Sequence, residues 1–368
     1  MSGARDIRGM RVIVAGAQTG GHLYPAVAVG RRLAAAGAEV TLVASGAPAE
    51  QAVLRDAGLR IEVLKVGKLK GMGLSARLRG MAGLPGGLLR ARAMVRKLDP
   101  AVALGFGGYT TGPLLLMASL AGVPVVVCEQ NSIPGFTNRV LARFARRVLV
   151  AFDETQSLIG AGGAVRTGNP VRPEVLAVPA KRYGGAARRV LVFGGSQGSG
   201  FLNERMPPVL AEVARRLPGL EVTHQTGTGR DAPVRAAYEA AGVRADVREY
   251  LHGMADAYAA ADFVACRAGA GTVFEVTAIG IPALFVPFAA AADDHQTANA
   301  RPVVAPGGAL SVAERDFDTA RVADWLAGLL ADPGRMQAMA DASRGWGVRD
   351  ALDRIADEVA AIGTGVGA

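Results

Sequence analysis

Short hydrophobic runs alternate with amphipathic stretches along the whole chain. Apolar runs bounded by glycine or polar residues are typical of buried parallel strands. In the first half such runs are 12–15, 40–44, 102–104, 123–127 and 148–150, with helical periodicity at 25–36, 75–97, 112–121 and 136–145. In the second half they are 190–193, 221–224, 245–247, 263–265 and 283–286, with helical periodicity at 201–216, 231–241, 253–260, 272–279, 295–301 and 349–362. The alternation predicts an α/β fold of two Rossmann-like, doubly wound parallel-sheet domains.

Glycine and proline interrupt this alternation near the middle of the chain, at 167–172 (TGNPVR). We therefore expect an N-terminal domain over 1–168 and a C-terminal domain over 169–345, with 173–187 as a linker. The tail, 346–368, is expected to form a helix that returns to the N-terminal domain. Ligands of such sheets bind at the carboxyl ends of the strands, so we expect the two domains to face a shared cleft.

One long uncharged segment, Pro100–Cys128, is long enough for a membrane span. Glycines and prolines divide it into strand, loop, helix and strand, which favours a buried βαβ segment; they are Gly105, Gly107, Gly108, Gly112, Pro113 and Pro124. At the N-terminus, the apolar run 12–17 is too short for a secretory signal. Cys128 and Cys266 both lie in apolar runs, which predicts buried thiols in a reducing compartment rather than a disulfide framework.

The composition narrows the class of partner. Half of the 368 residues are hydrophobic but only 5% are aromatic, which suits packed α/β layers. The 41 Lys and Arg against 32 Asp and Glu give a net charge of +9, which favours an anionic partner such as phosphate, nucleic acid or a membrane surface.

Two glycine-rich loops follow corresponding strands in the two halves, in RVIVAGAQTGGH (11–22) and RVLVFGGSQGSG (189–200). Glycines before a helix let backbone amides approach an anion. His22 could act as a base near neutral pH or merely cap the helix. Ser196 could bond a phosphate oxygen, or the loop could be a plain tight turn. The second loop is not a Walker A loop and lacks the acidic partner of an NAD site.

Other polar groups follow strands at the expected ligand edge. Glu275, in CRAGAGTVFE (266–275), is expected in the first turn of a helix, where it could grip ribose hydroxyls or only complement the helix dipole. Glu129, Gln130 and Asn131 end another strand and could be catalytic or structural. The polar residues of 293–299 lack the second histidine cluster of a metal site. Asp316-Phe317-Asp318 resembles a metal-binding D-x-D pattern, but a helix cap explains it better.

The segment 65–97 mixes basic with aliphatic residues and contains no acidic residue. This pattern is shared by interfacial membrane segments and by solvated basic helix faces, and the sequence leaves both open. Nucleic acid is a poor partner, because the basic residues alternate with Leu and Met rather than with aromatic side chains.

Several motifs in order resemble one enzyme family. They are TGGHLYPAVAV (19–29), GFGGYTTGP (105–113), EQNSIPGFTNR (129–139), GNPVR (168–172), GGSQGS (194–199), CRAGAGTVFE (266–275), PALFVPF (282–288) and DHQTANA (294–300). Together they resemble the N-acetylglucosaminyltransferases of glycosyltransferase family 28 that act in peptidoglycan synthesis. The resemblance implies a GT-B fold and inverting transfer of GlcNAc from UDP-GlcNAc to the MurNAc C4 hydroxyl of lipid I, giving lipid II. It implies no obligatory cofactor or metal.

The resemblance also implies roles for individual residues. His22 and Glu129 would be catalytic, and Tyr109 would lie on the acceptor side. The donor-binding residues would be Thr19, Gly20, Gly21, Asn131, Arg172, Ser196, Leu251, Ala270, Gly271, Thr272, Val273, Phe274, Glu275 and Gln296. Segment 65–97 would bind the anionic inner leaflet, which places the enzyme peripherally on the cytoplasmic face of the bacterial cell membrane.

Three departures from the family pattern keep alternatives open. Gln18 is an extra residue in the first loop. Residues 289–293, beside the expected donor site, are four alanines and one aspartate, with few groups that could contact a ligand. Two prolines lie in 301–312, where the family has a helix. The alternatives are a related UDP-GlcNAc-dependent transferase with another lipid or secondary-metabolite acceptor, a UDP-GlcNAc 2-epimerase, and a non-catalytic UDP-sugar sensor.

Overall fold

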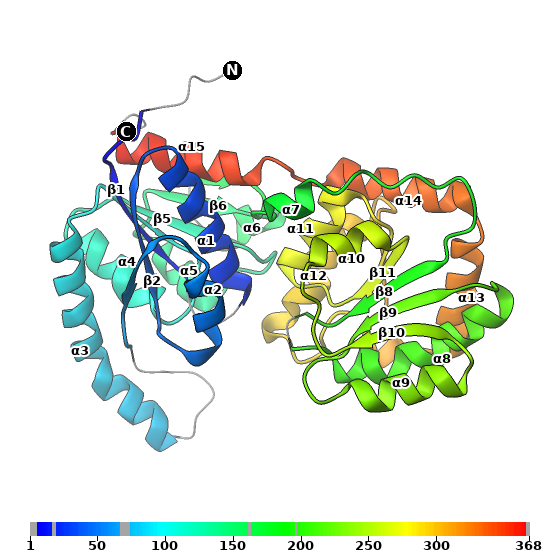
Figure 1. The fold of residues 1–368 in the computed structure, drawn as a ribbon. Coiled ribbons are helices and arrows are strands. Elements are labelled where there is room, and N and C mark those ends of the chain that lie inside the picture. Colours follow the sequence, from blue (N-terminus) through cyan, green and yellow to red (C-terminus); the bar gives the residue numbers. More distant parts are fainter. Residues whose placement is uncertain (1–5, 17–19, 67–73, 161–162, 196, 366–368) are drawn as a thin grey trace. The chain divides into compact units, whose positions relative to one another are not determined.

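The chain forms two compact units, described here from a computed structural model. One unit comprises Met1–Pro170 together with Asp350–Ala368, and the other comprises Val171–Arg349 (Figure 1). The structure describes residues 6–16, 20–66, 74–160, 163–195 and 197–365, with 20, 49, 52, 74–84 and 292 described by their backbone alone.

The N-terminal unit is built on a parallel sheet with strand order β3-β2-β1-β4-β5-β6-β7. Its strands are β1 (Arg11–Ala15), β2 (Glu39–Ala44), β3 (Arg60–Val63), β4 (Val102–Gly105), β5 (Val125–Glu129), β6 (Arg147–Val150) and β7 (Ala164–Arg166). Its helices are α1 (Gly20–Ala35), α2 (Gln51–Arg55), α3 (Leu74–Leu98), α4 (Thr111–Leu120), α5 (Phe136–Leu141), α6 (Asp153–Ile159) and α15 (Ala351–Gly363), and a 3-10 turn, η1, covers Pro48–Glu50.

Alternating residues of β1 explain why both faces of this sheet are covered. Val12 and Val14 pack with the buried faces of α1 and α15, including Leu23 and Val359. Ile13 and Ala15 face the other way, into a core formed with α3, α4 and α5. The uncharged segment Pro100–Cys128 is therefore β4, α4 and most of β5, as the βαβ interpretation predicted.

The second unit has a parallel sheet with strand order β10-β9-β8-β11-β12-β13. Its strands are β8 (Arg189–Phe193), β9 (Glu221–Gln225), β10 (Arg244–Arg248), β11 (Phe263–Cys266), β12 (Ala283–Phe285) and β13 (Leu310–Ser311). Its helices are α7 (Pro173–Leu176), α8 (Gly200–Arg216), α9 (Asp231–Ala240), α10 (Met254–Ala260), α11 (Ala270–Ile279), α12 (His295–Val304), α13 (Thr319–Leu330) and α14 (Pro333–Trp346), with 3-10 turns η2 (Ala292–Asp294) and η3 (Glu314–Asp316).

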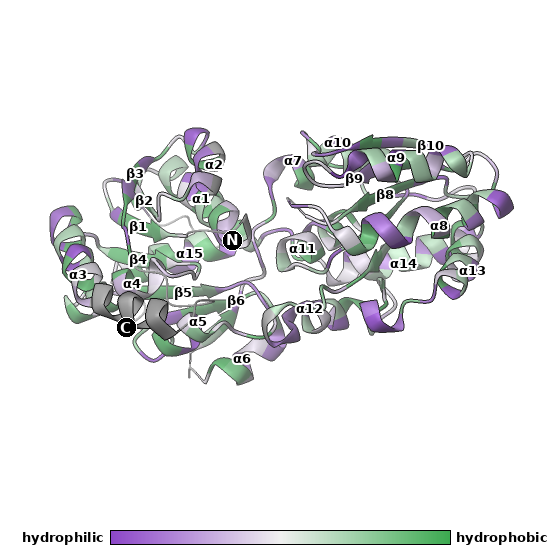
Figure 2. Cartoon of the chain, turned by 90° about the horizontal axis from the view of Figure 1, so that it is seen from below, coloured by the Kyte–Doolittle hydropathy of each residue, from purple (hydrophilic) through white to green (hydrophobic). Residues whose placement is uncertain are grey.

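Here too the helices cover both faces of the sheet. Val192 packs with α8, α9 and α13, whereas the next residue, Phe193, meets the ring of Tyr258 on α10 edge to face. In Figure 2 the strands of both sheets are largely hydrophobic, while hydrophilic residues gather on the helices and loops. Because both faces of each sheet are buried, the strand sequences are continuous apolar runs rather than alternating apolar and polar residues.

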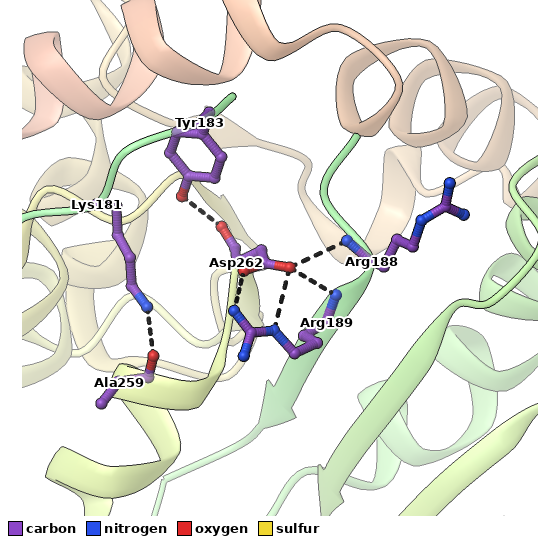
Figure 3. Close-up of polar contacts among 6 residues, drawn as sticks. All are labelled: Lys181, Tyr183, Arg188, Arg189, Ala259 and Asp262. Atoms are coloured by element: carbon purple, nitrogen blue, oxygen red, sulfur yellow. Dashed lines mark hydrogen bonds and ion pairs between the residues drawn. The ribbon is translucent and has the colours of Figure 1, made fainter. Parts of the chain in front are cut away.

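Asp262 connects the amino ends of β8 and β11 in the second sheet, at the opposite end of these strands from the expected ligand site. Figure 3 shows Asp262, just before β11, accepting hydrogen bonds from the backbone amides of Arg188 and Arg189, both at 3.0 Å, and pairing with the Arg189 guanidinium at 2.8 Å. Tyr183 donates to the Asp262 carbonyl at 2.6 Å, and Lys181 donates to the carbonyl of Ala259 at 2.7 Å. Through Lys181 and Tyr183, part of the expected linker 173–187 is hydrogen-bonded to the residues that precede β11.

The structure corrects several expected boundaries. Helix α1 begins at Gly20 rather than 25, which brings His22 into its first turn, and Pro25 lies inside the helix. Helix α11 begins at Ala270, so Glu275 lies in the second turn rather than the first. The expected linker contains α7. Asp318 caps α13 by accepting from the amide of Arg321 at 2.7 Å, as the capping interpretation predicted.

Candidate active site

In each sheet the strand order reverses at one point, where neighbouring strands send their connections to opposite faces. In the N-terminal sheet this point lies between β1 and β4, and in the second sheet it lies between β8 and β11. Ligands of open parallel sheets bind at the carboxyl ends of the strands at this switch point. The loops that follow β1, β4, β8 and β11 are therefore the places where site residues are expected.

In the N-terminal unit, His22 and Gly107 meet across the switch point. A methyl group on Gly107 would lie 3.2 Å from Nε2 of His22 and 3.5 Å from Nδ2 of Asn138. Gly107 has a φ of +97°, which disfavours any side chain. The glycine therefore lets a half-buried imidazole lie beside the loop after β4, and the same glycine lies close to Asn138 on α5.

Glu129, the last residue of β5, is a buried carboxylate enclosed by hydrogen-bond donors. Its Oε1 accepts from the amide of Asn131 at 2.9 Å, and its Oε2 accepts from the amide of Gly135 at 3.0 Å and from Nδ2 of Asn138 at 2.9 Å. Burial raises the pKa of Glu129, and these hydrogen bonds oppose the shift. The carboxylate thus organises the 129–138 loop, while its predicted catalytic role stays a prediction.

The remaining predicted residues of this unit lie in the loops after β4 and β5 and at the start of α1, or fall outside the described part. Tyr109 is half-buried in the loop between β4 and α4. The carbonyl of Asn131 accepts from the hydroxyl of Thr155 at 3.1 Å. Gly20 and Gly21 open α1. Thr19 lies outside the described residues, as does Gln18, so their predicted places are not described.

In the second unit, residues 194–195 and 197–199 lie between β8 and α8. Gly195 and Gly198 have φ values of +87° and +71°, and the amide of Gly198 donates to the carbonyl of Gly195 at 2.9 Å. The hydroxyl of Ser199 caps α8 by accepting from the amide of Leu202 at 3.3 Å. Glycines directly before a helix let backbone amides approach an anion. Ser196 lies outside the described residues.

Arg172 and Glu275, two predicted donor-site residues, bind one another. The guanidinium Nε donates to Oε1 of Glu275 at 2.8 Å, and the Tyr258 hydroxyl donates to Oε2 at 3.1 Å. Burial opposes the charge on Arg172, but the pair with Glu275 raises its pKa above the usual value. Burial, followed by the Glu275 charge, raises the pKa of Tyr258 strongly. Arg172 and Tyr258 thus hold the Glu275 carboxylate in place on α11. Each carboxylate oxygen accepts one of these bonds and can accept a further one from a ligand hydroxyl.

Residues 267–269 separate the end of β11 from the first turn of α11. Its amides lack intrahelical acceptors and carry the positive end of the helix dipole, which suits an anion or sugar oxygen. Ala270, Gly271 and Thr272 lie in this turn. The side chains of Val273 and Phe274 are fully buried, so a ligand could reach only the backbone of these two predicted residues.

The orientation of the Gln296 side-chain amide is fixed by two backbone hydrogen bonds to its oxygen. Its Oε1 accepts from the amides of Ala268 at 3.2 Å and Phe288 at 3.0 Å. The Nε2 group is therefore the end that can donate to a ligand oxygen. Leu251, predicted at the uracil, is buried after β10.

Sequence reasoning missed Arg267, which lies inside a motif that it singled out. The guanidinium lies between the rings of Phe201 and Phe288, pairs with Glu314 at 2.6 Å and donates to the carbonyl of Val286 at 3.0 Å. Burial lowers the pKa of Arg267 despite the ion pair. An arginine directly after a buried strand was the available signal, because a charge there must be paired.

The described helices and the described acidic, histidine and cysteine side chains bear on membrane insertion and on metal binding. None of the described helices is both long and apolar enough to cross a membrane. Across the part of the chain that the structure describes, no three His, Cys, Asp or Glu side chains are grouped as metal ligands would be. Cys128 and Cys266 are free and buried, as predicted.

Comparisons with known proteins place the chain in a family. Residues 12–150 match the glycosyltransferase family 28 N-terminal domain, and residues 189–355 match the family 28 C-terminal domain. The UDP-N-acetylglucosamine–N-acetylmuramyl-(pentapeptide) pyrophosphoryl-undecaprenol N-acetylglucosamine transferase of Anaeromyxobacter sp. (strain Fw109-5) is 40% identical over 95% of this chain and 92% of its own length.

Solved structures agree on the fold. The crystal structure of Acinetobacter baumannii MurG has a TM-score of 0.79 at 30% identity and covers 95% of this chain and 99% of its own. A putative UDP-N-acetylglucosamine 2-epimerase from Listeria monocytogenes has a TM-score of 0.68 at 14% identity over 94% of this chain and 95% of its own, which shows a shared fold alone. The chain therefore belongs to glycosyltransferase family 28 and is a GT-B N-acetylglucosaminyltransferase of the group that includes MurG.

Proposed function

We propose that this enzyme transfers GlcNAc from UDP-GlcNAc to the MurNAc C4 hydroxyl of lipid I, with inversion at the anomeric carbon. The main support for the proposal is the position of His22. In a chain of this family, a half-buried imidazole lies at the switch point of the N-terminal sheet with Gly107 leaving room beside it. A neutral imidazole there is suited to take the acceptor proton.

The donor is assigned to the second unit. Backbone amides of the 194–199 loop and of the first turn of α11 would offset the charge on the UDP diphosphate as it leaves. The Glu275 carboxylate would accept from the ribose hydroxyls, and Nε2 of Gln296 would donate to a sugar hydroxyl. Arg172 acts in this proposal through Glu275, because its Nε is already bound to that carboxylate.

The transfer is proposed as a single displacement. The acceptor oxygen attacks the anomeric carbon as the bond to the UDP oxygen breaks, and His22 takes the hydroxyl proton. Glu129 contributes by holding the loop that carries Asn131 and the first turn of α5, which carries Asn138. We propose that no resident metal is required, so that enzyme dialysed against EDTA keeps its activity in buffer without divalent cations.

Peripheral binding to the cytoplasmic face of the cell membrane is also proposed. Phe136, Val140 and Phe144 are exposed at intervals of four residues, with arginines at 139, 143 and 146 and no acidic residue over 136–146. On α3, Leu89 is 68% exposed within the described part of 65–97. Apolar side chains bordered by arginine suit an anionic lipid surface.

The decisive experiment is an acceptor screen with purified enzyme and UDP-GlcNAc. UDP release that depends on a lipid I analogue, with a β-linked disaccharide as product, is the expected result. Release with a different acceptor only would reassign the substrate. Conversion of UDP-GlcNAc without any acceptor, followed by NMR, would replace transfer with epimerisation.

A further inference from the structure

A chain of three hydrogen-bonded polar side chains, two of them fully buried, lies behind the 194–199 loop. His224, near the end of β9, is 0% exposed, and Tyr238 on α9 is 1% exposed. Nδ1 of His224 is 3.0 Å from the Tyr238 hydroxyl, and its Nε2 is 3.2 Å from Oδ1 of Asn203 on α8. Tyr238, His224 and Asn203 thus connect α9, β9 and α8 through hydrogen bonds that strand and helix packing does not require.

The direction of each hydrogen bond follows from the last member. Nδ2 of Asn203 donates to the carbonyl of Thr226 at 3.0 Å, so Oδ1 is the end that faces His224. Because Oδ1 can only accept, Nε2 of His224 must carry the proton, and Nδ1 then accepts from the Tyr238 hydroxyl. Burial lowers the pKa of His224 to about 3, so the imidazole stays neutral and keeps this single tautomer.

The end of the chain reaches the glycine loop by direct contact between backbones. A methyl group on Gly198 would overlap the carbonyl of Thr226, and one on Gly227 would overlap the carbonyl of Gln197. The backbone amide of Asn203 also donates to the carbonyl of Ser199 at 2.9 Å. Asn203 therefore holds both the end of the loop and the turn on which the loop lies.

We propose that His224 is a positioning residue for the diphosphate of the nucleotide donor. By orienting Asn203, it holds Thr226 and Gly227 where Gln197 and Gly198 rest, which presets the backbone amides of residues 197–199 for the phosphate oxygens. None of the three side chains has to touch the ligand. The inference rests on the proposed assignment of this loop to the UDP diphosphate.

The test compares nucleotides with and without phosphates. His224→Leu removes both hydrogen bonds at similar size, His224→Gln retains a donor toward Asn203, and Tyr238→Phe removes only the remote hydroxyl. For His224→Leu we expect UDP to bind about tenfold more weakly, while uridine binds within about twofold of wild type. KM for UDP-GlcNAc should rise in parallel, with kcat at saturating donor nearly unchanged. His224→Gln and Tyr238→Phe should both stay within about threefold of wild type for UDP.

Circular dichroism confirms folding before binding is compared. If His224→Leu does not fold, Asn203→Ala, at a half-buried position, breaks the same chain and is expected to show the same loss for UDP but not uridine. Equal losses for UDP and uridine, or none for either, would overturn the positioning role. Wild-type protein that does not bind UDP would instead overturn the proposed function, and the inference with it.

Discussion

Arg172 Nε donates to Oε1 of Glu275 at 2.8 Å, so two side chains that sequence motifs assign separately to the donor act as one unit. Glu275 is 15% exposed at its side chain and Arg172 is 32% exposed, so the pair is partly shielded from water. Each residue therefore fixes the place of the other, and neither can be changed without moving its partner.

Arg172→Ala should destabilise the second unit by about 2 kcal/mol, because it leaves a mostly buried carboxylate without its cation. Adding Glu275→Gln should recover part of the loss, since the neutral amide needs no counter-charge. Both tryptophans of the chain, Trp325 and Trp346, lie in this unit, so fluorescence in urea reports its unfolding. Strictly additive losses would show that the two side chains are not coupled.

His22→Ala should lower kcat about 10²- to 10⁴-fold, with little change in UDP affinity, because it removes the proposed base from the N-terminal unit only. Gly107→Ala is a graded companion, since its methyl group would crowd Nε2 of His22 at 3.2 Å and strain a backbone with φ +97°. Stopped assays of UDP release measure both variants. Full turnover in His22→Ala would remove the base assignment and leave the transfer reaction standing.

Glu129→Gln should lower kcat and loosen the 129–138 loop, because an amide NH₂ would then face one of the backbone donors that the carboxylate now accepts from. The expected loss of stability is about 1–3 kcal/mol, and hydrogen exchange at Asn131 and Gly135 should speed up. Glu50→Gln is the matched control: Glu50 is also a buried carboxylate, and it accepts from the amide of Gly46 at 2.8 Å in a loop after β2. A larger loss of turnover in Glu50→Gln would argue against a special role for the 129–138 loop.

Acid should destabilise the second unit through His224. An unfolded histidine gains a proton as pH falls through about 6.5, whereas the buried His224 stays neutral down to about 3, so acidification favours the unfolded state. Between pH 7 and pH 5 this residue should cost wild type about 2 kcal/mol. His224→Gln should lose that much less over the same range in urea titrations followed by tryptophan fluorescence. Equal losses in the two proteins would contradict the prediction.

Phe136→Glu and Phe144→Glu should weaken binding to vesicles of anionic lipid while leaving UDP affinity unchanged. Both place a negative charge on the exposed face of the 136–144 segment. Leu158→Glu is the control, because Leu158 on α6 is also an exposed apolar residue but lies outside this segment. Vesicle sedimentation at low and high salt measures the effect. Equal weakening by all three variants would indicate a nonspecific charge effect.

The long apolar strands were predictable because both faces of each sheet are buried, so runs such as that of β1 carry no polar interruption. β3, β7 and β13 were not predicted: they have no buried residues, and their pairing with β2, β6 and β12 is what makes them strands. Helix α11 starts earlier than predicted because its glycine-rich start carries no periodic signal.

Site residues were predictable where they stand in a short recognisable motif. They were not predictable where their role depends on hydrogen-bond or ion-pair partners that are distant in the sequence. Glu275 and Gln296 stand in recognisable motifs. His224 does not, because only the folded chain brings Tyr238 and Asn203, 14 and 21 residues away, to its two nitrogens. Arg267 was overlooked for the same reason, since its partner Glu314 lies in a remote turn.

The packing of α15 on the N-terminal sheet has a consequence for the timing of folding on the ribosome. Ile355 and Val359 complete the core shared by α1 and β1, yet they are synthesised after the entire second unit. At roughly 5–20 residues per second, the first unit waits on the order of ten seconds or longer for its last helix. The unit that begins first therefore finishes last, and the part of its sheet that α15 covers stays uncovered until that helix is synthesised.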